Sequence, residues 1–337
     1  MSRQNRSKLS VVLRSIITCL ILAVLASFVV SSKRLILDQI SVWEYQPSSE
    51  IEGLINRSGM GEHGKFLFLA SQPLLAKSTD DVQTFNSTCS NVERTTSILG
   101  CYSDYKIYLF DVTDTKLDGV RETTAAHEML HAAYLRMNDK DKTDVNKLLE
   151  AEADKLKANT DFNERMAYYD RNEPGQRDNE LHSVIGTEIA DISPDLETYY
   201  KKYFSDRRKV IILNAKYISV FQKISSRAKE LNAELTALAE NIKNNAAQYN
   251  ADVQAVNSSI TTFNSNASNG YFTSQSQFNA ERANLTSQVS NLSQARAKIN
   301  SDITKYGTLL DEYNSIASES KKLNNSLDST LVPAPSV

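Results

Sequence analysis

The longest regular pattern in the sequence lies in its last third, and it constrains the fold more than any other feature. From Ile224 to Ile242 the apolar residues alternate at spacings of four and three, which is the seam of a coiled coil. A polar break at 264–270 ends in Asn-Gly, and the seam then resumes. We therefore predict an antiparallel coiled-coil helical hairpin over 208–328, followed by a disordered tail at 329–337.

The predicted hairpin is an imperfect rod. Polar and charged residues, among them Asn244 and Arg282, lie at or near its seam. Such a rod suits a spacer or a partner-binding stalk better than a rigid core. We therefore expect the coiled coil to bind a protein partner or to self-associate.

The N-terminal segment is expected to cross a membrane. Residues 11–30 are almost wholly apolar, with Arg14 as their only charge, and a segment of this length spans a bilayer. More cations precede this segment than follow it, which predicts a cytoplasmic N-terminus. Residues 1–34 would then be a cytoplasmic tip and a single transmembrane signal anchor at the cell membrane, with the bulk of the chain extracytoplasmic. Small residues such as Ala26 leave a cleaved signal peptide as the alternative.

Length, charge and cysteine content narrow the class of protein. The 337 residues allow two domains, and the net charge of −3 shows no basic excess that would call for nucleic acid as a partner. Cys89 and Cys101 lie twelve residues apart. Outside the cytoplasm this pair is expected to form a disulfide. Two free, buried thiols are the alternative.

Residues 35–207 are expected to form a mostly helical α+β domain with a small sheet. The runs at 65–70 and 105–112 are rich in aromatic, apolar and β-branched residues and predict two strands. Ser193, followed by proline, predicts the start of a later helix. The tyrosines of that helix form a packing face in this interpretation; the alternative is that one of them donates a hydrogen bond to an oxyanion.

One helix of this domain carries the chemistry. In the His-Glu-x-x-His motif of His127, Glu128 and His131, the two imidazoles stand four residues apart and project from nearly the same face of a helix. Two neutral imidazoles on a rigid helix can hold a zinc ion with coordination positions left open. Glu128 flanks that position, where it can take a proton from water and pass it to a leaving amine. A chance pair of half-exposed histidines is the alternative.

A strand followed by a short loop and a helix with this motif resembles the zincin metallopeptidases. The resemblance covers about residues 105–205. It implies that His127, His131 and a downstream Glu hold Zn2+, while Glu128 acts as general base and then as general acid. It also implies an edge strand that lines the substrate cleft. The expected substrate is a peptide or protein, or an amide in a cell-wall peptide.

The third zinc ligand is expected within 178–191. The sequence around Glu180 resembles the thermolysin-like pattern Asn-Glu-x-x-Ser-Asp of the gluzincins, except that Val184 stands where that family has the Asp. Glu180 is therefore the preferred ligand. Glu188, two helical turns further along the same face, is the first alternative, and His182 is the second.

Two functions follow from these patterns. The first is a membrane-anchored, extracytoplasmic zinc metallopeptidase, bacterial in origin, that hydrolyses peptide bonds. The alternative is a non-catalytic cell-envelope scaffold or adhesin that acts through its coiled coil and carries a degenerate zincin-like domain. A substrate pocket beside the histidine pair would favour the enzyme. A third-ligand position that cannot bind metal would favour the scaffold.

Overall fold

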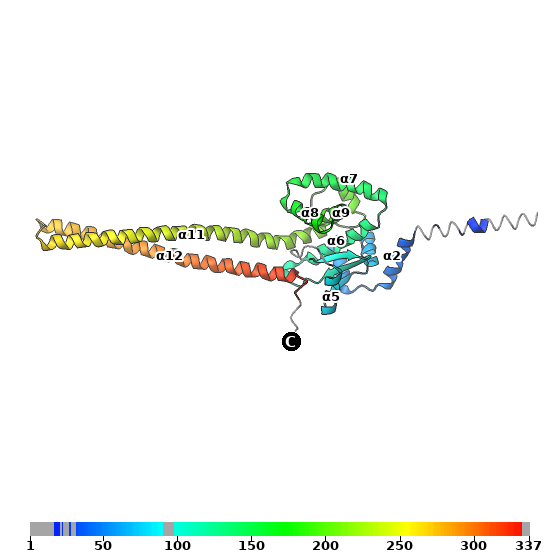
Figure 1. The fold of residues 1–337 in the computed structure, drawn as a ribbon, viewed down its shortest axis with the longest axis horizontal. Coiled ribbons are helices and arrows are strands. Elements are labelled where there is room, and N and C mark those ends of the chain that lie inside the picture. Colours follow the sequence, from blue (N-terminus) through cyan, green and yellow to red (C-terminus); the bar gives the residue numbers. More distant parts are fainter. Residues whose placement is uncertain (1–16, 21, 23–26, 28–31, 90–97, 332–337) are drawn as a thin grey trace, which may run out of the picture. The chain divides into compact units, whose positions relative to one another are not determined.

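The fold was analysed in a computed structural model, which describes residues 17–20, 22, 27, 32–89 and 98–331. Backbone contacts divide the chain into two compact units (Figure 1). The first unit comprises 1–219 and 324–337, and the second comprises 220–323. The division separates a mixed domain from a helical hairpin, and the candidate site lies within the first unit.

The first unit is mostly helical, with a three-stranded sheet of order β1-β3-β2. β1 pairs with β3 in parallel and β2 pairs with β3 in antiparallel fashion, so β1 and β2 are the edge strands. The described elements are α2 (Lys33–Glu44), α3 (Ser49–Ser58), α4 (Glu62–Ala70), β1 (Leu74–Ala76), α5 (Thr79–Thr88), β2 (Gly100–Ser103), β3 (Lys106–Phe110), α6 (Val120–Leu135), α7 (Asp139–Lys155), α8 (Thr160–Asn172), α9 (Arg177–Glu188) and α10 (Pro194–Tyr200), with short 3-10 turns at Thr115–Leu117 and Leu156–Ala158.

Helix α6 is the central element of this unit. It contacts α9 and also β2 and β3, and Figure 1 shows α9 and the sheet on opposite sides of it. Its apolar residues Ala126, Met129 and Leu130 are fully buried, each with no exposed surface. Because both sides of α6 are covered, the side chains on its remaining face are held in fixed positions.

The strand predicted at 65–70 is wrong, because these residues lie in α4. The helix follows Gly61 and buries Leu67, Phe68, Leu69 and Ala70 in succession. A short run that is buried all round has no periodicity that distinguishes a strand from a helix, and tertiary packing decided in favour of the helix. The sheet instead takes β1 from Leu74–Ala76, for which no strand was predicted, while the strand expected at 105–112 is β3.

The predicted N-terminal transmembrane helix is not supported, and the fold is corrected to a mostly helical one with a small sheet. Within the parts of the chain that the structure describes, no helix combines the length and the apolar composition needed to cross a bilayer. The first described helix of the domain, α2, carries Arg34 and buried Asp38, side chains that lipid would exclude. Most of residues 11–30 lie outside the described residues.

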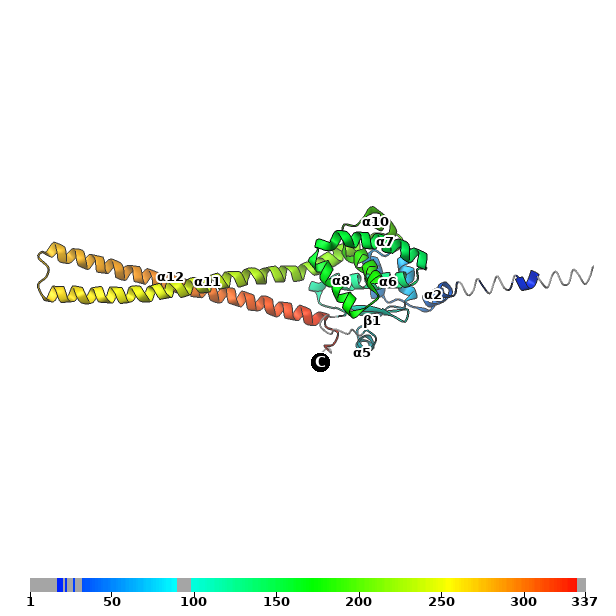
Figure 2. The ribbon, with the colours of Figure 1, turned by 45° about the horizontal axis from the view of Figure 1, so that its top comes forward.

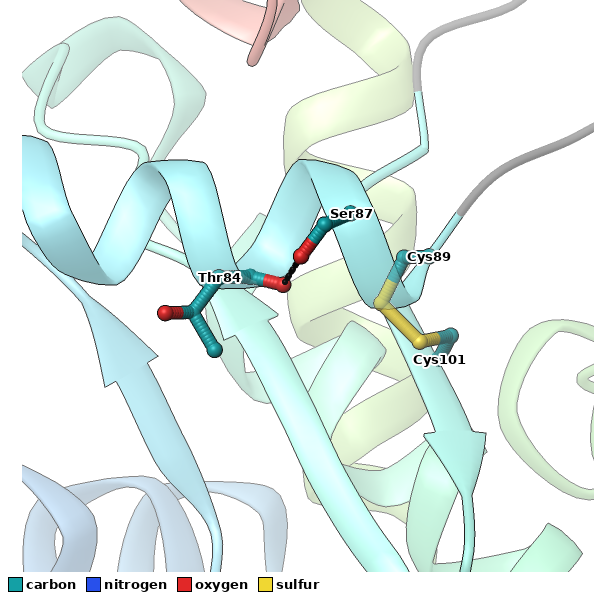
Figure 3. Close-up of a disulfide and its surroundings, with 4 residues drawn as sticks. All are labelled: Thr84, Ser87, Cys89 and Cys101. Atoms are coloured by element: carbon teal, nitrogen blue, oxygen red, sulfur yellow. Dashed lines mark hydrogen bonds between the residues drawn. A yellow bond between two sulfur atoms is a disulfide. The ribbon is translucent and has the colours of Figure 1, made fainter.

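A disulfide joins the end of α5 to strand β2. Cys89 caps α5 and Cys101 lies in β2, with their Cα atoms 5.7 Å apart (Figure 3). The last turn of α5 is also closed by the Ser87 hydroxyl, which donates to the carbonyl of Thr84. The pairing is the one that the sequence predicted. It links the edge strand beside α6 to a separate helix.

The second unit is an antiparallel hairpin. Helices α11 (Arg208–Ser268) and α12 (Gln275–Leu327) lie alongside one another and are joined by a short turn at one end (Figure 2). Arg227 Nε and Nη2 donate to the two carboxylate oxygens of Glu312, at 2.8 and 3.0 Å, and tie the arms together. At the turn the rings of Phe263, Phe272 and Phe278 pack with centroids no more than 5.4 Å apart.

The tail predicted from residue 329 begins with ordered residues. Ser329 is buried, and its carbonyl accepts a hydrogen bond of 2.8 Å from Asn86 of α5. Residues 332–337 lie outside the described part of the chain.

An ion pair fixes the C-terminal end of α6. Arg136, the cap residue, donates from Nε and Nη2 to both oxygens of Asp38, at 2.9 Å each, and from Nη1 to the hydroxyl of Tyr102 at 2.6 Å. Burial alone would raise the pKa of Asp38, but hydrogen bonds from Arg136 and Arg34 outweigh it and hold this pKa below its usual value. The pair thereby connects α2, α6 and β2.

Replacement of Asp38 should destabilise the domain in a pH-dependent way. Asp38→Asn leaves the Arg136 guanidinium buried without its counter-ion, and we expect a loss of about 3 kcal/mol at pH 7. Because the folded pKa is depressed, the wild-type advantage is present above the unfolded pKa of about 3.9 and is lost as the pH falls further. Urea unfolding at pH 7 and at pH 3 measures both effects.

The control for this prediction is Asp154→Asn. Asp154 forms an exposed i,i+3 pair with Lys157, with 65% of its side chain accessible, so its loss should change stability by no more than about 0.5 kcal/mol. Equal effects of the two substitutions would contradict a structural role for the Asp38 pair.

Candidate metal centre

Helix α6 brings together His127, Glu128 and His131. Metal-ligating atoms of the three residues lie within 4.8 Å of one another, and the two imidazole centroids are 4.7 Å apart. Glu128 and His131 are 5% and 8% exposed. The three side chains could therefore hold a metal ion, as the spacing in the sequence predicted.

Helix α9 places a second carboxylate against both imidazoles. Glu180 Oε1 lies 3.3 Å from His131 Nε2, and Oε2 lies 3.6 Å from His127 Nε2. Glu180 is 1% exposed, and in the described part of the chain no group lies within hydrogen-bonding distance of its Oε2. A buried carboxylate oxygen without a donor is costly unless a cation or a donor meets it. The donor set of two imidazoles and one carboxylate therefore fits a metal ion, and Glu180 as its third ligand stays a prediction.

The two alternative ligands are engaged elsewhere. Glu188 forms an ion pair with Arg165 of α8. His182 is fully buried, and its Nε2 lies 2.9 Å from the hydroxyl of Tyr199. Burial first, and then the neighbouring His131, lower the pKa of His182 to about 3, so its imidazole is neutral within an aromatic cluster. Of the three candidates, only Glu180 faces the histidine pair.

Two side chains of α9 orient His131. Asn179 Oδ1 lies 3.0 Å from His131 Nδ1, and Ser183 Oγ lies 3.3 Å from the same nitrogen. Since Asn179 Nδ2 donates to Gln176, its Oδ1 is the acceptor that faces the ring. His131 thus carries its proton on Nδ1 and presents the Nε2 lone pair toward Glu180.

The carboxylates and imidazoles of the site shift one another's pKa. Burial alone would lower the pKa of His127, yet the carboxylates, with Glu180 first, raise it to about 9. Burial also acts on Glu180, but the two imidazoles outweigh it and lower the pKa of that carboxyl. For Glu128, burial is the largest cause and raises the pKa. Glu180 therefore favours its charged form, whereas the raised pKa of Glu128 makes that carboxylate better able to accept and release a proton.

Close backbone approaches position these groups. A Cβ on Gly186 of α9 would lie 2.7 Å from Tyr200 and would overlap Leu130 of α6, so only glycine lets the two helices pack this tightly. A Cβ on Gly100 of β2 would lie 2.9 Å from Glu128 Oε1. Edge strand β2 therefore runs directly over the acidic side chain of the motif.

A cleft of about 1210 Å³ opens over these residues. Its lining includes His127, Glu128, His131 and Glu180 together with the edge strand β2 and the disulfide. The strand that lines the cleft is β2, whereas the strand expected at 105–112 is β3, which is central in the sheet and contributes no residue to the lining. The cleft is large enough for a peptide-sized ligand.

Helix α8 contributes two cleft residues that were not predicted. Tyr169 stacks near His127 with ring centroids 6.4 Å apart, and burial raises its pKa well above the usual value, so its hydroxyl keeps its proton. Glu173 lines the cleft, and burial followed by the charge of Glu180 raises its pKa to about 7. Tyr169 lies in the last turn of α8 and Glu173 is the C-cap of that helix, four residues later.

The tyrosines of α10 have a different role. Tyr199 and Tyr200, with Tyr203 just beyond the helix, pack around His182, and none of the three lines the cleft. The packing face predicted from the sequence is what the structure shows. The alternative of an oxyanion donor on this segment has no support from its geometry.

The chain was compared with protein-family models, curated proteins and solved structures, and none of the three comparisons gave a match.

Removal of the His131 partner should weaken metal binding. Asn179→Leu keeps the volume but leaves Nδ1 without its better acceptor, so the imidazole loses its fixed orientation. We expect the affinity for a divalent ion to fall about tenfold or more. Competition against a chromophoric chelator measures it. Ser183→Ala, which removes the longer contact, is the matched variant and should cost less; an unchanged affinity in Asn179→Leu would rule out the orienting role.

Proposed function

We propose that this protein is a zinc-dependent metallopeptidase. The observation that carries the proposal is the convergence of Glu180, from a separate helix, on the two imidazoles of the His-Glu-x-x-His helix at the wall of a cleft. Two histidines and one glutamate form a donor set used by catalytic zinc sites, which leave a coordination position open. The cleft and a third position able to bind metal both favour an enzyme over a scaffold.

Zinc fits this donor set because nitrogen and carboxylate ligands in a small, buried site suit it. A bound zinc ion would supply Lewis acidity, which lowers the pKa of water and polarises the carbonyl of the scissile bond. The chain's own residues supply the remaining steps. His127, His131 and Glu180 would hold the ion, with His131 fixed by its contact to Asn179.

Glu128 is the proton carrier in this proposal. Its carboxylate accepts a proton from the attacking water and then delivers it to the nitrogen of the leaving amine. Burial raises its pKa, which brings the carboxyl closer to the range in which it can both accept and donate. Tyr169, which keeps its hydroxyl proton beside His127, is placed to donate a hydrogen bond to a negatively charged oxygen in the cleft.

The disulfide supports a setting outside the reducing cytoplasm. Structural disulfides persist in oxidising compartments, and the Cys89–Cys101 bridge lies at the rim of the cleft. We therefore place the proposed activity there, with a peptide or protein substrate and with cell-wall peptides within the range to be tested. The hairpin of α11 and α12 is proposed to bind a protein partner or a second copy of the chain.

Metal analysis tests the zinc site. We expect about one zinc per chain in the wild type and a loss of zinc in Glu180→Ala, because two histidines alone bind weakly. Glu188→Ala is the matched control on the same helix and should keep its zinc, since Glu188 pairs with Arg165. Mass-spectrometric metal content after dialysis gives the answer. A wild type that binds no zinc even after reconstitution would overturn the enzyme proposal in favour of the coiled-coil scaffold.

The role of Glu128 is tested by Glu128→Gln. The amide keeps the size of the side chain but cannot take the proton, so kcat/KM for peptide hydrolysis should fall by about 10²–10⁴. The zinc content should stay at the wild-type level, which separates loss of the base from loss of the metal. Activity that survives this substitution would exclude Glu128 as the general base.

A further inference from the structure

Part of the cleft lining other than the proposed metal ligands is acidic, and we call it the acidic end of the cleft. It comprises Asp161, Glu164 and Arg165 of α8 and Glu188 of α9, and Tyr217 of α11 lies near Glu188 and Arg165. Three carboxylates thus accompany one guanidinium, and that guanidinium is already paired with Glu188. Asp161 and Glu164 are both exposed. This end of the cleft therefore has a surplus of negative charge that would attract a cation.

Asn214 of α11 gives an independent sign of a ligand at the same end. The residue lines the cleft and is 8% exposed, and within residues 32–89 and 98–331 no group forms a hydrogen bond with its Oδ1. A buried amide oxygen without a donor costs about 1–3 kcal/mol. An N–H group of a ligand would remove that cost. The acceptor and the surplus charge call for the same kind of partner, a positively charged nitrogen that donates hydrogen bonds.

The surroundings of Asn214 form one continuous wall. Tyr217 and Ile218 follow it at helical spacing and also line the cleft. Burial first, and then the charge of Glu188, raise the pKa of Tyr217 to about 12, which places that hydroxyl within the field of the Arg165–Glu188 pair. Apolar and aromatic groups beside an acceptor suit a long side chain whose stem is hydrophobic and whose head is charged.

Tyr169 connects this end of the cleft to the metal centre. It stacks near His127, and the charges of Glu188 and Arg165 act on the pKa of its hydroxyl. A peptide whose scissile bond lies at the metal centre would therefore place another of its residues at the acidic end of the cleft.

We propose that Asn214, with Asp161, Glu164 and Glu188, forms a subsite that binds the side chain of a lysine or arginine of the substrate. The inference rests on the proposed peptidase function and specifies its substrate class. Asn214 Oδ1 accepts a hydrogen bond from the cationic nitrogen, and the carboxylates supply the compensating charge. Asn214 is the specificity-determining residue, because it is the buried member of the set and its oxygen has no partner among the residues that the structure describes.

Binding, measured without turnover, tests this subsite. The full chain with Glu128→Gln is loaded with zinc and titrated into three fluorescein-labelled hexapeptides that differ only at one position, which holds lysine, Nε-acetyllysine or norleucine. The variable residue is placed in turn at each of the six positions of the peptide, so that every alignment of the peptide in the cleft is tested. Fluorescence anisotropy should show that lysine binds about tenfold more tightly than norleucine. Acetyllysine, which keeps an N–H but loses the charge, should fall between them.

Substitutions in the subsite separate the two contributions. In Asn214→Leu the preference for lysine over norleucine should drop to about threefold or less, while Tm stays equal or rises because a buried, unpartnered oxygen is removed. Asp161→Asn with Glu164→Gln should weaken lysine binding and its dependence on salt, but leave acetyllysine unchanged. Asp154→Asn, an exposed carboxylate on α7, is the matched control and should leave all three affinities unchanged.

The outcomes distinguish this inference from the proposed function. Equal affinity for lysine and norleucine at every register in the wild type, or an unchanged preference in Asn214→Leu, would overturn the subsite even if peptide hydrolysis is observed. A preference for lysine that Asn214→Leu abolishes would support the subsite even if no hydrolysis is found, because the measurement needs neither the general base nor turnover.

Discussion

The packing of α9 onto α6 is the constraint on which the candidate site depends. The two helices can approach as they do because Gly186 has no side chain to place between Leu130 and Tyr200. This approach places Glu180 beside both imidazoles and Asn179 beside Nδ1 of His131. Metal ligands on two separate helices are only as well placed as the interface between those helices. The geometry of the candidate site therefore depends on the same side-chain packing that forms the core of the domain.

The sequence predicted the parts of the structure that depend on local patterns. The spacing of His127 and His131 and the seam of the hairpin are periodic signals, and the strand at 105–112 is marked by its aromatic and β-branched residues; none of these needs knowledge of the fold. The stretch at 65–70 gave no such signal, since four successive buried residues satisfy a helix and a strand equally. The transmembrane prediction rested on apolar composition, and no described helix supports it.

The parts that the sequence left open depend on contacts between distant segments. Glu180, Glu188 and His182 share one helix, and only tertiary packing shows that the first meets the imidazoles while the others meet Arg165 and Tyr199. Tyr169 and Asn214 were not predicted as cleft residues for the same reason. Neither belongs to a motif, and each lies in the cleft because tertiary packing brings α8 and α11 to it.

Strand β2 passes so close to Glu128 that position 100 has room for hydrogen alone. This has an evolutionary consequence. We expect a related sequence that keeps Glu128 to keep glycine at position 100 as well, because a Cβ there would crowd the carboxylate. A related sequence without the acidic residue is under no such constraint, and a larger residue can occupy position 100. The residues at positions 100 and 128 are therefore expected to vary together.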